Sequence, residues 1–102
     1  MVLAEFSMFP TDKGESVSQY VSQVLDVIDK SGLQYQLTPM GTILEGTWEE
    51  VFAVISRCYK VLEPQCNRVY SSIKVDYRKG EKSRMKSKID KIQSVLNREI
   101  KH

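Results

Sequence analysis

The carboxylate of Glu45 is the side chain best placed for chemistry. It stands between Leu44 and Gly46 in a short apolar stretch that reads as a strand at the centre of a sheet. A buried charge is costly unless it is paired, so this group needs a partner. The partner is either Lys74 or a backbone donor on a neighbouring strand, or else a bound ligand. For a ligand, Gly41 and Gly46 would allow close approach of the backbone, and Trp48 or Tyr35 would supply a flat stacking surface.

The remaining polar residues argue against catalysis. The single histidine, His102, is the terminal residue, which disfavours Ser-His-Asp or Cys-His catalysis and histidine metal sites. The five glycines are scattered and form no phosphate-binding loop, which argues against nucleotide hydrolysis. Glu49 and Glu50 stand at the first turn of a predicted helix, where capping and the helix dipole account for them. We therefore expect no catalytic residue, no metal site and no cofactor.

The two cysteines favour packing over reactivity. Cys58 and Cys66 are too few for a disulfide framework or a cysteine zinc site, which indicates a reducing, cytoplasmic compartment. Cys58 falls in phase with Ile55 and Leu62 and is expected to be a small buried hydrophobe rather than a reactive thiol. No apolar run is long enough to span a membrane, and we see no signal peptide.

Size and composition predict a single domain over residues 1–102. The chain has 41% hydrophobic and 27% charged residues, which is ordinary for a folded domain with a core. Its net charge of +2 hides an asymmetry. Residues 1–56 contain two basic and eight acidic side chains, whereas residues 57–102 contain thirteen and five. The basic half is either a solvated helix or a surface that attracts an acidic partner or a second subunit.

Hydrophobic periodicity predicts four strands and three helices. Alternating apolar residues indicate strands, and apolar residues three to four apart indicate amphipathic helices. Capping boxes are expected at Ser16 with Gln19 and at Thr47 with Glu50, and a left-handed cap at Gly32. The expected strands are 2–9, 33–38, 42–45 and 69–77, and the expected helices are 16–31, 47–62 and 85–100.

The predicted fold is an α+β, ferredoxin-like β-α-β-β-α-β sandwich with an additional C-terminal helix. Right-handed crossovers place the first and third strands in the centre and both crossover helices on one face. A third helix, a second subunit or a ligand must then cover the other face, and the free strand edges favour pairing with another chain. We expect that face to carry Leu3, Glu5, Phe9, Gln34, Gln36, Tyr70, Ser72, Lys74 and Asp76.

The segment from Lys30 to Val51, which reads KSGLQYQLTPMGTILEGTWEEV, resembles the hallmark segment of a family of small proteins described as thiamine-binding. That family, formerly of unknown function, is related to the YkoF-like binders of hydroxymethylpyrimidine and thiamine. Further similarity covers nearly the whole chain, at residues 16–18, 68–70, 73–78 and 91–95.

This resemblance implies a ferredoxin-like fold, a homodimer or homotetramer, and non-catalytic binding of thiamine or its hydroxymethylpyrimidine moiety near subunit interfaces. It implies no nucleic-acid or membrane partner. A carboxylate such as Glu45 can pair with an aminopyrimidine edge, and acidic or aromatic groups suit the cationic thiazolium. The ligand-binding residues that the resemblance points to are Ser18, Thr38, Met40, Gly41, Thr42, Glu45 and Asp76.

Two other functions remain open from the sequence. One is a structural or regulatory homo-oligomer without a metabolite ligand. The other is an RNA-binding module, because ferredoxin-like sheets can present stacking aromatics and residues 78–91 hold seven basic against two acidic side chains. The first strand offers Phe6 and Phe9 for stacking, but the fourth strand lacks the Gly-aromatic pattern of RNA-binding sheets.

Overall fold

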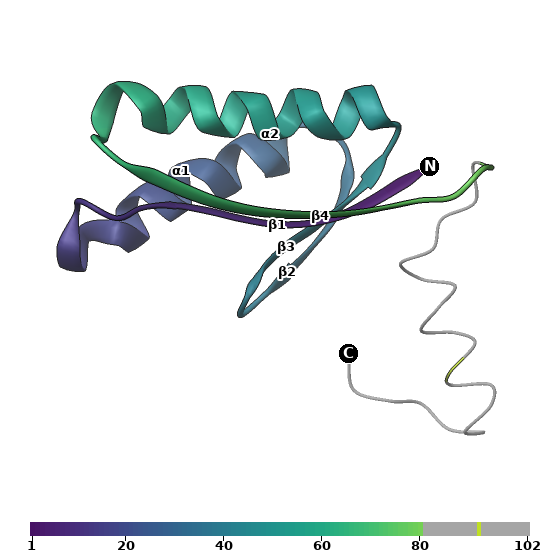
Figure 1. Cartoon of the computed structure of the whole chain (residues 1–102), viewed down its shortest axis with the longest axis horizontal. Coiled ribbons are helices and arrows are strands. Elements are labelled where there is room, and N and C mark those ends of the chain that lie inside the picture. The colour runs from purple at the N-terminus through teal and green to yellow at the C-terminus, as the bar shows by residue number, and fades with distance from the viewer. Residues whose placement is uncertain (81–91, 93–102) are drawn as a thin grey trace.

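The elements follow the predicted order β-α-β-β-α-β (Figure 1). The computed structural model describes residues 1–80 and 92 of the chain. The predicted third helix, over residues 85–100, lies outside the described residues except for residue 92. The strands are β1 Val2–Pro10, β2 Gln34–Thr38, β3 Gly41–Gly46 and β4 Val69–Tyr77, and the α-helices are α1 Val17–Lys30 and α2 Trp48–Leu62. Two short 3-10 turns are η1 Gly14–Ser16 and η2 Glu63–Gln65.

The strands form one antiparallel sheet in the order β2-β3-β1-β4, with β1 and β3 in the centre as predicted. Both helices cover the same face of this sheet (Figure 1). The α+β, ferredoxin-like arrangement expected from the sequence is therefore confirmed. No helix among the described residues is long and apolar enough to cross a membrane.

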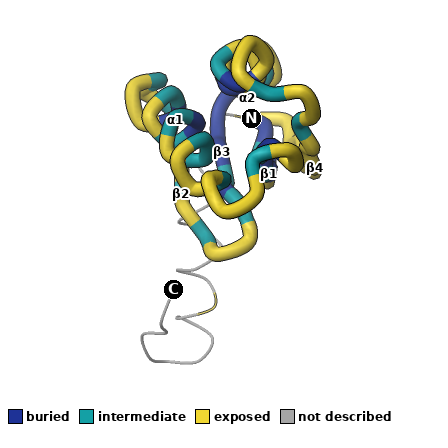
Figure 2. Tube along the Cα trace, turned by 90° about the vertical axis from the view of Figure 1, so that its left-hand side faces the viewer, coloured by how far each residue is buried: buried dark blue, intermediate teal, exposed yellow. Residues whose placement is uncertain are grey.

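The core lies between the sheet and the two helices. The alternation in β1 turns Val2, Ala4, Phe6 and Met8 toward the helices, and each is buried. Burying a large aliphatic or aromatic side chain contributes about 1.5–3 kcal/mol. The core seen in Figure 2 is completed by Val24, Ile28, Leu44, Val51, Val54, Ile55, Cys58 and Leu62. Cys58 is fully buried, as predicted.

The two helices begin differently. At α2 the predicted capping box is confirmed, because the Glu50 N–H donates to Thr47 Oγ1 at 3.2 Å and the Thr47 N–H donates to Glu50 Oε1 at 2.9 Å. At α1 the predicted box is wrong, since the Ser16 side chain makes no capping bond. Ser16 already belongs to η1, with φ −83° and ψ 5°, whereas a capping serine needs an extended backbone. Gly32 has the predicted positive φ, 81°.

The sheet has an open face, the side turned away from α1 and α2. Directly opposed residues in an antiparallel sheet point to the same side, so the register fixes its composition. One row across all four strands reads Gln34, Glu45, Leu3 and Asp76. The next row reads Gln36, Ile43, Glu5 and Lys74, and beyond it Ser7 lies opposite Ser72. The mixed surface that the sequence predicts is therefore confirmed.

Candidate functional site

The seven residues implied by the family resemblance fall into separate groups. Thr38, Met40 and Gly41 form the turn between β2 and β3. Glu45 and Asp76 lie in one row at the other end of the open face, on either side of Leu3. The two that remain, Ser18 and Thr42, lie on α1 and on the helix-facing side of β3.

The β2–β3 turn is held rigidly against β1. Thr38 Oγ1 donates to the Gly41 carbonyl at 3.0 Å and accepts from the Met40 N–H at 3.2 Å. A Cβ at Gly41 would lie 2.7 Å from the Phe6 carbonyl oxygen, so only glycine allows this close approach. The Met40 side chain is 84% exposed. The turn therefore presents a flexible thioether from a fixed backbone.

A hollow of about 390 Å³ lies beside this turn. It forms where residues 7–9 of β1 continue past the end of their pairing with β3. The hollow is mainly apolar in its lining, with Phe9 from β1 and Val21 from α1. The full lining is Ser7, Met8, Phe9, Val21, Leu37, Thr38, Pro39, Met40 and Gly41.

Two further hollows lie on the open face, and each shares lining residues with its neighbour. The second, of about 220 Å³, shares Ser7 and Met40 with the first, and the third, of about 290 Å³, shares Glu5 and Lys74 with the second. We call these three adjoining hollows the sheet trough. The second is lined by Glu5, Phe6, Ser7, Met40, Ser72 and Lys74, and the third by Leu3, Glu5, Ile43, Lys74, Val75 and Asp76.

The far end of the sheet trough is acidic. Asp76 lines it, and Glu5 lies one row away. Glu45 borders it, because its cross-strand neighbour Leu3 and its same-face neighbour Ile43 both line the third hollow. Glu45 is only 3% exposed. Lys74 lies in the next row, on β4. That strand is two strand spacings, about 10 Å, from β3. The row of Glu45 also holds Asp76, whereas Lys74, one of the partners considered from the sequence, lies one row away.

The other two implied residues lie outside the lining of the sheet trough. Thr42 lies opposite Phe6 on the helix-facing side and is 5% exposed. Ser18 is exposed on α1, one helical turn before Val21, and its carbonyl accepts a bond from Ser22 Oγ at 2.7 Å. The sequence reasoning about the site did not single out Ser7, although the alternation of β1 places it on the same face as Glu5.

The aromatic residues of the open face are not those proposed from the sequence for stacking. Tyr35 lies on the helix-facing side, where its hydroxyl donates to Asp29 Oδ1 at 2.7 Å. Trp48 lies on α2 with its ring 4.4 Å from that of Phe52. Phe9 and Tyr70 face each other across β1 and β4, with ring centroids 5.7 Å apart. Phe9 thus supplies the aromatic surface of the first hollow.

Among the described residues, the histidine, cysteine, aspartate and glutamate side chains form no group of three or more that could hold a metal ion. Burial raises the pKa of the Cys58 thiol to about 11, so it stays protonated at neutral pH. What the site provides is an elongated surface with an apolar end and an acidic end. That arrangement suits binding of a molecule with one cationic or amine-bearing ring.

The chain is similar to known proteins along most of its length. The model of a family described as "Thiamine-binding protein" matches residues 4–93. UPF0045 protein MJ1052 of Methanocaldococcus jannaschii is 35% identical over 91 residues, covering 89% of this chain and 91% of that protein. UPF0045 protein Mb1933 of Mycobacterium bovis is 38% identical over 98 residues, covering 95% and 96%.

Solved structures show the same fold. The crystal structure of the hypothetical protein MJ1052 matches with a TM-score of 0.80, covering 89% of this chain and 94% of that one. A candidate thiamine biosynthesis or salvage protein of Thermotoga maritima matches with a TM-score of 0.78 at 21% identity, covering 89% and 97%. This second likeness concerns the fold alone.

Proposed function

Because the chain belongs to the thiamine-binding protein family, we propose that it binds thiamine or its hydroxymethylpyrimidine half in the sheet trough without converting it. The observation that carries this proposal is that each of the three hollows shares two lining residues with the next. Five of the seven implied residues line or border these hollows, from the β2–β3 turn to the row of Glu45 and Asp76.

Thiamine has two linked rings of different chemistry, and the two ends of the sheet trough differ in the groups that they offer to a ligand. The aminopyrimidine presents an amine beside a ring nitrogen, which a carboxylate can engage in two directions. The thiazolium is cationic and favours carboxylates or aromatic faces. We assign the acidic end, with Glu45 and Asp76, to the pyrimidine, and the end with Phe9 and Met40 to the thiazolium.

A protein that binds such a molecule without chemistry acts as a carrier, a sensor or a buffer. We place it in the cytoplasm, because its two cysteines are free thiols, one of them in the core. We also propose that it works as a homodimer or homotetramer. A ligand in the open face would then lie near a subunit interface.

Thermal unfolding with and without thiamine tests the proposal. A ligand that binds only the folded state stabilises it by about 2.7 kcal/mol at one hundred times its Kd, so thiamine should raise the Tm. Glu45→Gln should abolish this rise, because it removes the charge that engages the amine. Met40→Ala should reduce the rise without harming the fold, since the Met40 side chain is 84% exposed.

Glu49→Gln is the matched control. It also removes one carboxylate, but from the exposed first turn of α2 and away from the sheet trough. Its response to thiamine should equal that of the unmodified protein. If thiamine raises the Tm of Glu45→Gln as much as that of the unmodified protein, Glu45 is not part of the binding site. No response of the unmodified protein to thiamine, hydroxymethylpyrimidine or the thiazole half would favour a homo-oligomer without a metabolite ligand.

One observation in the structure argues against the RNA-binding alternative. Phe6, one of the two aromatics that the sequence offers on the first strand, points into the core and is 2% exposed. Within the described part of the chain, only Phe9 and Tyr70 present rings on the open face. The RNA-binding alternative would be supported if the protein retained RNA on a filter at low salt and lost it at high salt.

A further inference from the structure

We propose that the sheet trough takes the phosphate monoester of hydroxymethylpyrimidine, with Lys74, Ser72 and Ser7 binding the phosphate. This inference rests on the proposed function and deepens it, because it names the chemical form of the pyrimidine that the site prefers. It gives a role to the second hollow, which shares lining residues with both of the others.

The first argument is the position of the pyrimidine ring. In the proposed site the ring binds between Glu45 and Asp76, which lie in one row on either side of Leu3. Leu3 and Ile43 line the third hollow and offer an apolar floor to the flat face of the ring. The carboxylates at its edge accept hydrogen bonds from the amine. The hydroxymethyl group, which the ring carries beside the amine, can then point along the trough.

The second argument is what lies in the next row. Successive rows are two residues apart on each strand, which is about 7 Å. Lys74 lies in the row that follows that of Asp76, and it lines both the third and the second hollow. Its ammonium group is at the end of a flexible four-carbon side chain. A phosphate on the hydroxymethyl group would therefore arrive within reach of this ammonium.

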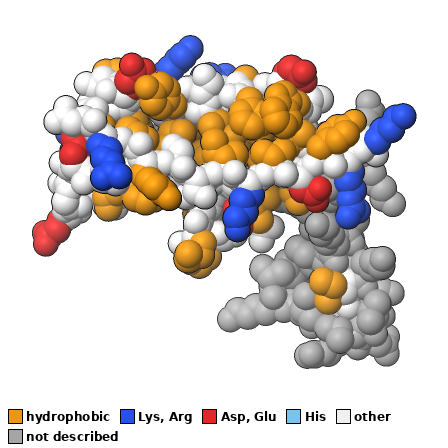
Figure 3. Space-filling view, in the orientation of Figure 1, with side chains coloured by type: hydrophobic (Ala, Val, Ile, Leu, Met, Phe, Trp, Pro, Cys, Tyr) orange, Lys and Arg blue, Asp and Glu red, His pale blue; other side chains and the backbone are white. Residues whose placement is uncertain are grey.

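The third argument concerns the charge of Lys74. No side-chain ion pair within residues 1–80 involves this lysine. Its cross-strand neighbour is Glu5, and Figure 3 shows basic and acidic side chains next to each other below α2 and β4. A phosphate monoester carries a charge of about −1.5 to −2 at pH 7 and three acceptor oxygens. It is therefore a stronger partner for Lys74 than one carboxylate.

The fourth argument is a pair of hydroxyl groups in the same hollow. Ser7 and Ser72 are directly opposed on β1 and β4, and both line the second hollow, of about 220 Å³. The Cβ atoms of opposed residues are about 4.5–5.5 Å apart, so both hydroxyls can donate to one phosphate. Ser72 also lies on the same side of β4 as Lys74. One ammonium and two hydroxyls thus line a single small hollow.

The same position of Lys74 acts against a cationic ligand arm. Thiamine carries its thiazolium on the carbon to which the hydroxyl of the free pyrimidine is attached. With the pyrimidine in the row of Leu3, the thiazolium lies beside Lys74 on the way to Met40. Like charges repel, so Lys74 disfavours the thiazolium and favours a phosphate. Removal of Lys74 should therefore change the affinities for the two ligands in opposite directions.

Titration calorimetry with four probes tests the proposal. These are hydroxymethylpyrimidine, its phosphate monoester, thiamine and inorganic phosphate. The unmodified protein should bind the monoester about tenfold more tightly than the free pyrimidine, because a hydrogen bond to a charged group is stronger than a neutral one. Lys74→Gln should remove most of this preference, leave the Kd of the free pyrimidine unchanged and lower the Kd of thiamine.

Three further variants control for charge and position. Lys74→Arg keeps the charge and should keep the preference for the monoester. Lys60→Gln is the matched control, because it also removes one exposed lysine charge, but from the last turn of α2. It should leave all four Kd values unchanged. Glu5→Gln should tighten binding of the monoester, because it removes a negative charge opposite Lys74.

Each outcome supports or overturns the proposal. Equal affinity of the unmodified protein for the pyrimidine and its monoester would overturn it, whatever the variants do. Equal weakening of every ligand by Lys74→Gln would show a general effect on the fold, and would also overturn it. If inorganic phosphate alone binds as tightly as the monoester, the hollow is an anion site without a role for the pyrimidine.

The same titrations separate this proposal from the proposed function. Binding of thiamine and of the free pyrimidine, without a preference for the monoester, would overturn the phosphate proposal and leave the proposed function standing. If none of the three pyrimidine compounds binds, both fall. The preference of the unmodified protein is measured without any substitution, so a variant that fails to fold does not prevent a decision.

Discussion

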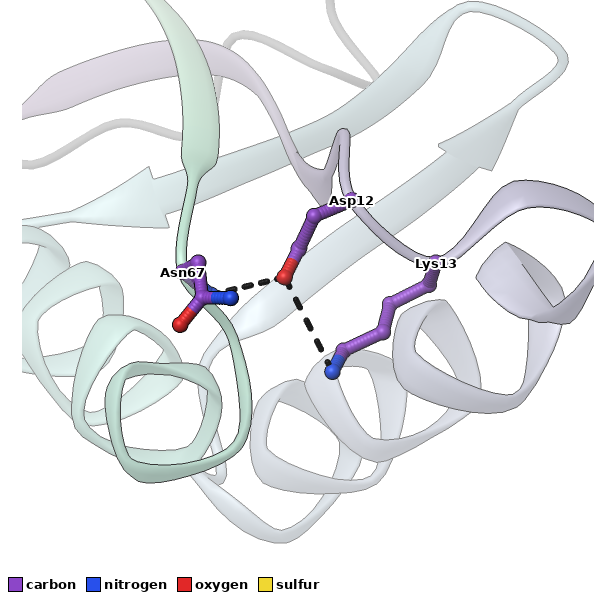
Figure 4. Close-up of polar contacts among 3 residues, drawn as sticks. All are labelled: Asp12, Lys13 and Asn67. Atoms are coloured by element: carbon purple, nitrogen blue, oxygen red, sulfur yellow. Dashed lines mark hydrogen bonds and ion pairs between the residues drawn. The ribbon is translucent and has the colours of Figure 1, made fainter.

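Asp12 connects two segments that are 55 positions apart in the chain. Its Oδ2 accepts from the Asn67 N–H at 2.8 Å and lies 3.8 Å from Lys13 Nζ (Figure 4). The hydrogen bond from Asn67, and next the charge of Lys13, hold the pKa of Asp12 below its ordinary value. This contact fixes the loop after β1 against the start of β4. No local sequence pattern predicts this hydrogen bond, because Asp12 and Asn67 are brought together only by the pairing of β1 with β4.

The pH dependence of stability tests this contact. Because the pKa of Asp12 is lower in the folded than in the unfolded chain, its charged form adds stability above the ordinary pKa, and this is lost as the pH falls through the lowered pKa. Asp12→Asn should therefore lower the Tm at pH 7, and the difference from the unmodified protein should shrink below about pH 4. An equal difference at pH 7 and pH 2.5 would contradict this role.

At the scale of elements, the capping of the start of α2 could be predicted from the sequence, whereas that of α1 could not. The α2 start needs only Thr47 and Glu50, three residues apart, and an extended residue before the first turn. Ser16 with Gln19 has the same spacing, but the turn η1 gives Ser16 the wrong backbone conformation. Residue spacing shows that a cap is possible, whereas the preceding turn decides whether it forms.

Alanine substitutions distinguish the two helix starts. Thr47→Ala should lower the free energy of unfolding by about 1 kcal/mol, because it removes a capping acceptor. Ser16→Ala should change it by less than about 0.5 kcal/mol, because its side chain makes no capping bond. Urea unfolding of both variants measures the difference. A larger loss in Ser16→Ala than in Thr47→Ala would contradict the assignment of the caps.

At the scale of the whole molecule, α1 and α2 pack on one side of the sheet, and no helix or strand within residues 1–80 covers the other side. The core is therefore a single layer between sheet and helices, and Cys58 lies at its centre with no exposed surface. The open face is the side of the sheet on which we propose that a ligand binds. The mixed composition of this face was predicted from the alternation of the strands and their order in the sheet.

Thiol labelling reports the opening of this core. Cys58 has a raised pKa of about 11 and is fully buried, so it should react only when the molecule unfolds globally. In a Cys66→Ser background, iodoacetamide at pH 8 should label Cys58 at a rate that rises with urea in parallel with unfolding. The partly buried Cys66, tested in Cys58→Ala, should react faster in the absence of urea. Fast labelling of Cys58 in the native protein would contradict its place in the core.

The sequence by itself determined the element order, the sheet order and the faces of β1. These follow from local periodicity, capping residues and the handedness of crossovers, which act over a few residues or over one connection. Only the tertiary structure decided that Thr38, Met40 and Gly41 share a trough with the row of Glu45 and Asp76, and that Thr42 does not. Register sets these relations, and a shift of one residue would turn every side chain to the opposite face.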